Sequence, residues 1–124
     1  MTQTVIRILT VRQPWASAII YAGKDVENRR WTTKYRGRLY IHAGMQVDAD
    51  DVLPRDTPAP RGAIIGHVEL VGIVTDSASR WAEAGQYHWV LGAAVPLAAP
   101  VPARGRLGLW SPDQKIASAL RRDS

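Results

Sequence analysis

The sequence predicts a mainly β fold with short helices (α+β), built as a small, highly curved β-barrel with helices at its ends. Roughly six short β-branched or alternating runs are separated by turn residues, and only two stretches have helical character. Gly66 and Gly72 interrupt the longest apolar run, which favours the bulges that curl a sheet into a barrel. The 124 residues contain no evident linker, so we expect one domain over residues 1–124.

The first half of the chain alternates between strands and one helix. Residues 5–11 form a β-branched run typical of a buried strand. Pro14 suits the first turn of a helix that we expect to end at Gly23. Residues 26–31 are predicted as the second strand and residues 38–43 as the third. In that third strand alternation predicts an apolar face and a polar face, the polar one formed by Arg38, Tyr40 and His42.

The second half contains the longest predicted strand. Residues 48–60 are acidic and proline-rich and predict a loop, and residues 62–76 predict the long strand. Ser77 could cap a short helix over 78–84, and residues 87–91 predict another strand. Three prolines at 96, 100 and 102 should break the next segment into extended pieces at a sheet edge. Residues 107–110 predict a last strand, and residues 111–124 a helix or a tail.

The charge of the chain indicates a polyanionic partner or an anionic ligand. The net charge is +5, and residues 1–42 alone carry eight cations against two acids. Thirteen arginines stand against three lysines, and arginine suits bidentate phosphate contacts and stacking on bases. Biased coding toward arginine would give the same count.

The composition excludes some kinds of site and argues against others. The chain has no cysteine, which excludes disulfides and thiolate metal sites and fits a reducing compartment. No apolar run reaches about 18 residues, so we expect no membrane span and a cytoplasmic location. His42, His67 and His88 lack the short spacing of metal ligands, so we expect no metal and no cofactor. The sequence leaves the oligomeric state open.

Charged residues gather between the first helix and the second strand. Lys24, Glu27 and Arg29 follow Gly23 directly, and residues 27 and 29 share one face of a strand. Lys24 lies just past the turn, where its long side chain can reach back toward them. An ammonium, a carboxylate and a guanidinium would then shift one another's proton affinity. A solvated charged turn is the alternative.

This segment resembles the signature of a known family. Gly23-Lys24-x-x-Glu27-x-Arg29 is similar to the G-x-K-x-x-E-x-R motif of the ASCH domain family, whose fold is a PUA-like β-barrel. The segments at residues 12–16, 35–43, 62–66 and 87–91 also resemble the helix entry and strands of that family. The resemblance covers residues 8–110.

The resemblance implies a role connected with nucleic acid. PUA-like barrels bind RNA, and ASCH domains are proposed to do so in a cleft between the first helix and the barrel. Some members are amidohydrolases that deacetylate N4-acetylcytidine, and some are reported as ribonucleases. The amidohydrolases use a lysine at the position of Lys24, a threonine three residues later and a glutamate from elsewhere in the chain. Here Glu27 replaces the threonine, and the distal acid would be Glu69 or Glu83.

We therefore predict an ASCH-domain protein that binds RNA or a nucleoside in a basic cleft around this motif. The alternative is a small hydrolase of modified nucleosides or a ribonuclease, with water activated by a carboxylate and Lys24 polarising a carbonyl. The third interpretation is an interaction domain that does not bind nucleic acid, which would show no salt-sensitive affinity for RNA. For the Lys24–Glu27 pair itself, the alternative to a functional role is a structural salt bridge that fixes the turn. The candidate catalytic residues are Lys24, Glu27 and Glu69. The candidate ligand-binding residues are Arg12, Trp15, Arg29, Arg36, Arg38, Tyr40 and His42, with Trp31 as a further stacking candidate.

Overall fold

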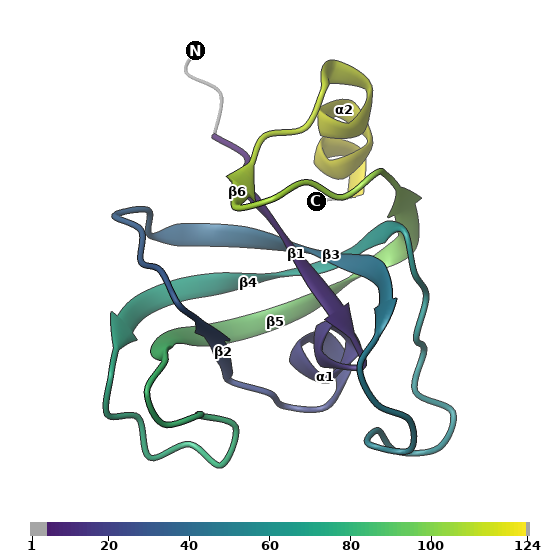
Figure 1. The fold of residues 1–124 in the computed structure, drawn as a ribbon. Coiled ribbons are helices and arrows are strands. Elements are labelled where there is room, and N and C mark those ends of the chain that lie inside the picture. The colour runs from purple at the N-terminus through teal and green to yellow at the C-terminus, as the bar shows by residue number, and fades with distance from the viewer. Residues whose placement is uncertain (1–4, 124) are drawn as a thin grey trace.

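The structure is a computed structural model, and it describes residues 5–123. Six strands form one mixed sheet in the order β2-β5-β4-β3-β1-β6, with two helices on its opposite sides (Figure 1). The elements are β1 (Ile8–Gln13), α1 (Trp15–Tyr21), β2 (Val26–Arg29), β3 (Gly37–Val47), β4 (Ala63–Val74), β5 (Tyr87–Pro102), β6 (Leu109–Trp110) and α2 (Gln114–Asp123). The predicted barrel-like, mainly β architecture is confirmed.

The sheet curls round, but no backbone pairing joins β2 to β1, which leaves an open seam between these two strands. β1 pairs in parallel with β3, and β6 covers the other edge of β1 only at Ile8 and Leu9. Within residues 5–123, β2 pairs only with β5. The Arg29 side chain of β2 crosses this seam and donates to the Thr10 carbonyl of β1 at 2.9 Å. A side chain, rather than a strand ladder, therefore joins the two edges.

The two predicted irregularities in the long strand are confirmed. The pairing of β4 with β5 shifts register between Ile64 and Gly66 and again between Leu70 and Gly72. A Cβ at residue 66 would lie 2.7 Å from Ile20 Cδ1 and from the carbonyl oxygen of Val95. Only glycine allows α1 to approach the sheet this closely.

Apolar side chains gather on both faces of the sheet. One cluster lies inside the curl and includes Ile19 of α1, Ile41 and Trp89. The second lies beneath α2 and includes Tyr40 and Leu120. The prediction that Tyr40 lies on a polar face is therefore wrong, because α2 covers that face of β3. Trp89 and Leu120 are among the largest side chains with almost no exposure.

Two local predictions need correction. Residues 75–86 form a loop and not the predicted helix over 78–84. The Ser77 hydroxyl accepts from the Ser79 N–H at 3.1 Å, as a cap would, but the Ser79 hydroxyl then donates to Asp25 and accepts from the Trp81 N–H. Asp25 and Asn28 hold this loop against β2 instead.

β5 also continues through its prolines as one strand, although we expected it to be broken. β2 pairs only with its first four residues, so the proline-containing part has a neighbour on one side only. An N–H is not needed on the open side, and proline is tolerated there. The predicted edge position is thus confirmed.

The remaining elements follow the sequence closely. β3 runs to Val47, beyond the predicted end at residue 43, and residues 48–62 contain neither helix nor strand. α1 is seven residues long, and the predicted C-terminal helix is present as α2, ending at Asp123. Neither described helix has the length and apolar character that crossing a membrane requires.

Candidate functional site

The turn after α1 directs Lys24 into the protein. Gly23 has φ +75°, a conformation that glycine adopts without strain, and the Lys24 N–H then donates to the Ala18 carbonyl at 3.0 Å. This reverses the chain over the end of the helix. As a result the Lys24 side chain points back toward β2, and the residue is only 5% exposed.

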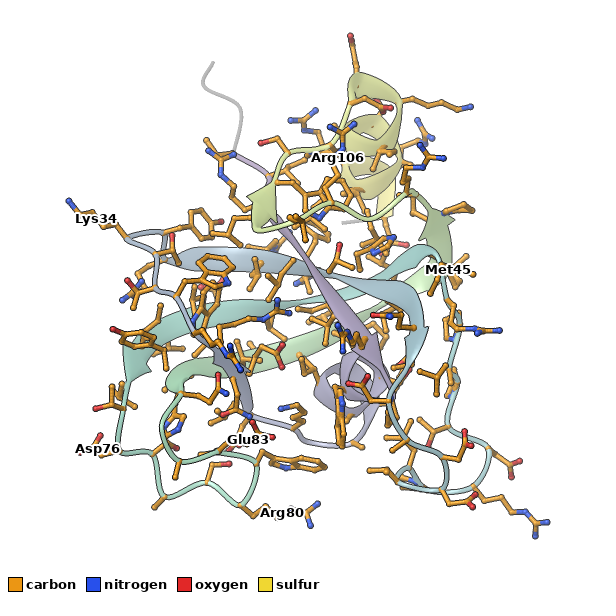
Figure 2. The ribbon with its side chains drawn as sticks, in the orientation of Figure 1. Lys34, Met45, Asp76, Arg80, Glu83 and Arg106 are labelled. Atoms are coloured by element: carbon orange, nitrogen blue, oxygen red, sulfur yellow. The ribbon has the colours of Figure 1, made fainter. Side chains whose placement is uncertain are left out.

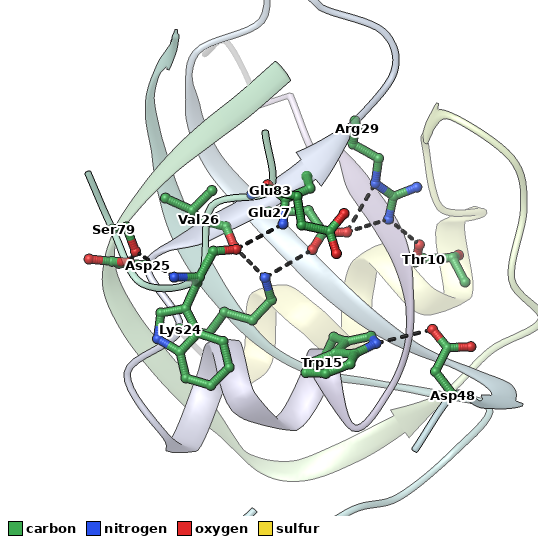
Figure 3. A network of polar contacts seen from close by, with 12 residues as sticks. Thr10, Trp15, Lys24, Asp25, Val26, Glu27, Arg29, Asp48, Ser79 and Glu83 are labelled. Carbon is green, nitrogen blue, oxygen red and sulfur yellow. Dashed lines mark hydrogen bonds and ion pairs between the residues drawn. The ribbon is translucent and has the colours of Figure 1, made fainter. Parts of the chain in front are cut away.

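Glu27 bridges two cations at this point (Figure 3). Its Oε1 lies 3.6 Å from Lys24 Nζ, and its Oε2 accepts from Arg29 Nε at 3.0 Å and lies 2.9 Å from Nη2. Lys24 Nζ also donates to the Val26 carbonyl. Arg29 continues across the seam to Thr10. The structure therefore brings together the three charged residues of the sequence motif as one buried chain of contacts.

Burial and neighbouring carboxylates act in opposite directions on the Lys24 ammonium. Desolvation lowers the pKa of Lys24 below its ordinary value, and the Glu27 carboxylate, followed by Glu83 and Asp25, opposes that shift. The net direction is downward. Lys24 is thus a cation whose proton affinity depends on the charges around it, which is common for groups in functional sites.

A cleft of about 1420 Å³ opens along the unclosed seam and contains this network on its wall. Its lining comes from β1, α1, β2 and β3, the loop at residues 80–86 and the segment at residues 103–108. Seven arginine or lysine side chains and three carboxylates line it, giving a net charge of +4. The cations are Arg12, Lys24, Arg29, Arg30, Arg80, Arg104 and Arg106, and the acids are Glu27, Asp48 and Glu83. The cleft is therefore suited to an anionic ligand.

One wall is the loop between β4 and β5, which side chains of the sheet hold in place. The Asn28 amide donates to the Trp81 carbonyl and accepts from the Glu83 N–H, both at 2.9 Å. His88 accepts from the Ser77 N–H at 3.1 Å and donates to the Glu83 carbonyl at 2.6 Å. These bonds fix a loop that has no helix or strand of its own.

The same loop brings an aromatic ring and a second cation to the cleft. Lys24 Nζ lies 5.6 Å from the centre of the Trp81 ring, and the Arg80 guanidinium lies 4.4 Å from it. Such distances suit cation–π attraction. Figure 2 shows Arg80 and Glu83 on this loop and Arg106 on a segment distant in sequence.

The opposite wall is built on Asp48, just after β3. Its carboxylate accepts from the Trp15 indole at 3.0 Å and pairs with Arg12 at 3.4 Å. Trp15 is only partly buried, so the indole keeps surface toward the cleft that it lines. Asp48 thus orients one aromatic and one cationic side chain together.

His42 lies beneath the segment at residues 103–108 and is 1% exposed. Its Nε2 donates to the Ala103 carbonyl at 2.7 Å, while its Nδ1 has no hydrogen-bond partner within residues 5–123. Burial lowers the pKa of His42, and the bond to Ala103 opposes that change. A Cβ on Gly105 would lie 3.0 Å from His42 and from Thr10, so this segment fits closely over the floor of the cleft.

Six of the predicted site residues line the cleft and four do not. Lys24, Glu27, Arg29, Arg12, Trp15 and His42 line it, as does Trp31. Arg36 and Arg38 are exposed outside it, Tyr40 is buried under α2, and Glu69 is exposed on β4. Of the two candidate distal acids, only Glu83 therefore lies in the cleft with Lys24.

Sequence reasoning missed several cleft residues because they come from irregular segments. Trp81 and Arg80 lie in the loop that we had predicted as a helix, and Arg104 and Arg106 follow the proline-containing strand. The Arg-Gly-Arg sequence at 104–106 was the available signal, since clustered arginines indicate a surface that attracts polyanions.

Comparison with known proteins gives consistent results. The sequence model described as the ASCH domain matches residues 9–102. Activating signal cointegrator 1 from Homo sapiens is 25% identical over 138 aligned positions, covering 92% of this chain and 23% of that protein. The same protein from Mus musculus matches to the same extent. The chain thus spans about a quarter of the length of these relatives.

Solved structures share the fold. A point mutant of the ASCH protein from Zymomonas mobilis superposes with a TM-score of 0.64 at 17% identity, over 96% of this chain and 98% of that chain. A second structure of ASCH from the same organism gives a TM-score of 0.61 at 16% identity, over 94% of this chain and 93% of that chain. At this level of identity the likeness concerns the fold alone.

Proposed function

This chain belongs to the ASCH domain family, and on that premise we propose that it binds RNA, or a nucleoside, in the cleft along the β1–β2 seam. One observation carries the proposal: a buried lysine, paired with the Glu27 carboxylate, lies on the wall of a large cleft with net charge +4. The proposal includes the cytoplasmic location expected from the sequence.

The exposed cations at the rim supply the attraction for phosphates. Arg30, Arg80, Arg104 and Arg106 are all exposed and line the cleft. Arginine binds phosphate oxygens bidentately. Arg29 differs from them, because Glu27 and Thr10 already occupy its guanidinium. We therefore assign Arg29 to holding the site together and the rim arginines to the ligand backbone.

The interior of the cleft suits a nucleobase. Trp15 and Trp81 lie on its two walls, and stacking of one base on an aromatic side chain contributes about 1–3 kcal/mol. Lys24 has three N–H donors, of which the Val26 carbonyl and Glu27 take two. The third is available to an acceptor on the ligand.

A hydrolase is the second candidate, because a lysine with a lowered pKa and an acid, Glu83, share one cleft. Two features favour binding over turnover. Glu27 stands where the amidohydrolases have a threonine, so the hydroxyl nucleophile is missing at that position. Both oxygens of Glu27 are engaged by Lys24 and Arg29, which leaves this carboxylate poorly placed to activate water.

Two assays test the proposal. The first titrates a labelled single-stranded RNA at several salt concentrations against wild type and the double variant Arg104→Glu/Arg106→Glu. The plot of log affinity against log salt has a negative slope, and losing two phosphate contacts should reduce the magnitude of that slope by about 1.4. Arg36→Glu makes the same kind of charge change outside the cleft and should keep the wild-type slope. Equal slopes in all three proteins would refute the proposed site.

The second assay measures turnover of N4-acetylcytidine by wild type and Lys24→Ala. We expect no cytidine from either protein. Cytidine from wild type alone would establish the hydrolase instead and would make Lys24 part of its machinery.

A further inference from the structure

The cleft contains two carboxylates near Lys24 whose situations differ sharply. Glu27 is shared by Lys24 and Arg29, whereas the Glu83 carboxylate makes no hydrogen bond or ion pair within the part of the chain that the structure describes. Glu83 is exposed and lines the cleft, and its charge acts on the Lys24 ammonium. Figure 3 shows both acids with Lys24 in one close-up. Glu83 is thus an unoccupied acceptor beside a cation.

The backbone of Glu83 is held on both sides. Its N–H donates to Asn28 Oδ1 at 2.9 Å, and its carbonyl accepts from His88 Nε2 at 2.6 Å. His88 is 3% exposed, so this anchor is buried. The neighbouring Trp81 carbonyl accepts from the same Asn28 amide. The backbone that carries this acid is therefore preorganised, and only the side-chain rotamers of Glu83 remain to be ordered when a ligand binds.

The unpaired Glu83 carboxylate repels the phosphates of a nucleic acid. Its ligand contact must therefore be with hydrogen-bond donors on another part of the nucleotide. An ionised carboxylate only accepts hydrogen bonds, through two oxygens. On its Watson–Crick edge guanine offers two adjacent N–H donors, N1–H and N2–H, followed by the O6 acceptor. Adenine and cytosine place a ring-nitrogen acceptor beside their single amino group. Uracil has one imino donor between two carbonyls.

We propose that the cleft selects an unpaired guanine, whose N1–H and N2–H groups bind the two oxygens of Glu83. This assignment rests on the proposed RNA-binding function and specifies its ligand. Guanine O6 then lies toward the Lys24 ammonium, which has one donor free. A base that meets Glu83 with an acceptor leaves the carboxylate desolvated and unpaired, which gives discrimination by repulsion as well as by attraction.

The test uses five short RNAs of identical sequence except at one central position, which is guanosine, inosine, adenosine, cytidine or uridine within a uridine tract. Affinities are measured by fluorescence anisotropy at two salt concentrations, and the five oligomers are compared at the lower one. Wild type should bind the guanosine oligomer about tenfold tighter than the adenosine, cytidine and uridine oligomers. Inosine lacks the 2-amino group and should fall between them.

Glu83→Gln is the decisive variant. Its amide keeps the size of the side chain but offers one acceptor in place of two, and it removes a negative charge from the cleft. The preference for guanosine should disappear, because the guanosine oligomer loses its paired acceptors, while affinity for the adenosine, cytidine and uridine oligomers should equal or exceed that of wild type. Glu69→Gln is the matched control, because it removes the same charge from an exposed position outside the cleft and should keep the preference.

The outcomes separate this inference from the function on which it rests. Salt-dependent binding of all five oligomers with equal affinity would overturn the assignment of guanine and leave RNA binding intact. A guanosine preference that survives Glu83→Gln would overturn the role of Glu83. No salt-dependent affinity for any oligomer would overturn both the inference and the proposed function.

Discussion

Glu27→Gln should be among the most damaging single substitutions in the motif. At an effective dielectric of about 20, a charge pair is worth roughly 5 kcal/mol at 3.6 Å and roughly 6 kcal/mol at 2.9 Å, the distances of Glu27 from Lys24 and Arg29. Desolvation offsets much of this in the native protein. Removal of the carboxylate leaves that desolvation uncompensated, so we expect a loss of about 3–5 kcal/mol in the free energy of unfolding.

Lys24→Met should cost less than Glu27→Gln. It removes the buried ammonium together with its desolvation cost, and Glu27 keeps its bonds to Arg29. The double variant should lose less stability than the sum of the two single variants, by about 1–3 kcal/mol, because the residues share one network. Urea unfolding, with the m-value checked for constancy, measures all three losses.

A small effect would refute this reasoning. If Glu27→Gln costs less than about 1 kcal/mol, the network behaves as a solvent-exposed ion pair. The same conclusion would follow if the two single losses simply add. Either result would mean that the charges at the seam are hydrated, and that the Lys24 ammonium is not held by its neighbours.

Two further predictions concern the floor of the cleft. Burial lowers the pKa of His42 in the folded protein, so as the pH falls below about 6.5 this residue is protonated in the unfolded chain before it is protonated in the folded one. The free energy of unfolding should therefore fall with the pH, by at most about 1.4 kcal/mol per pH unit. His42→Gln should flatten this dependence in urea unfolding between pH 7 and pH 5, and an unchanged slope would contradict the assignment. Gly105→Ala should cost about 1–3 kcal/mol, because its Cβ would press on His42 and Thr10, whereas Gly72→Ala meets no atom within 4 Å and should leave the thermal midpoint near that of wild type.

The strands and the charged motif were accessible from local sequence. β-branched runs gave β1 and the start of β4, and the bulges at Gly66 and Gly72 followed from glycine within an apolar strand. The motif was informative because Gly23 permits the tight turn that points Lys24 toward β2. Each of these inferences depends on residues close together in the chain.

What the sequence could not supply depends on elements far apart in the chain. Alternation in β3 predicted a polar face, but α2 covers it at Tyr40 and buries that residue. The helix expected over 78–84 is replaced by a loop because Asn28 and His88 satisfy its backbone groups, which local propensity does not reveal. The cleft is lined by the unclosed seam and by two loops, so Trp81 and Arg106 come near the motif only in the folded chain.

The tryptophan indole N–H signals give the most direct test of the central claim, that ligand enters the seam between β1 and β2. Trp15 and Trp81 line the cleft, whereas Trp89 lies in the core with its indole bonded to the Trp31 carbonyl. In a ¹H–¹⁵N spectrum titrated with a short guanosine-containing RNA, we predict that the Trp15 and Trp81 signals move and that the Trp89 signal stays in place. Saturable binding that leaves both cleft signals unmoved would contradict the account.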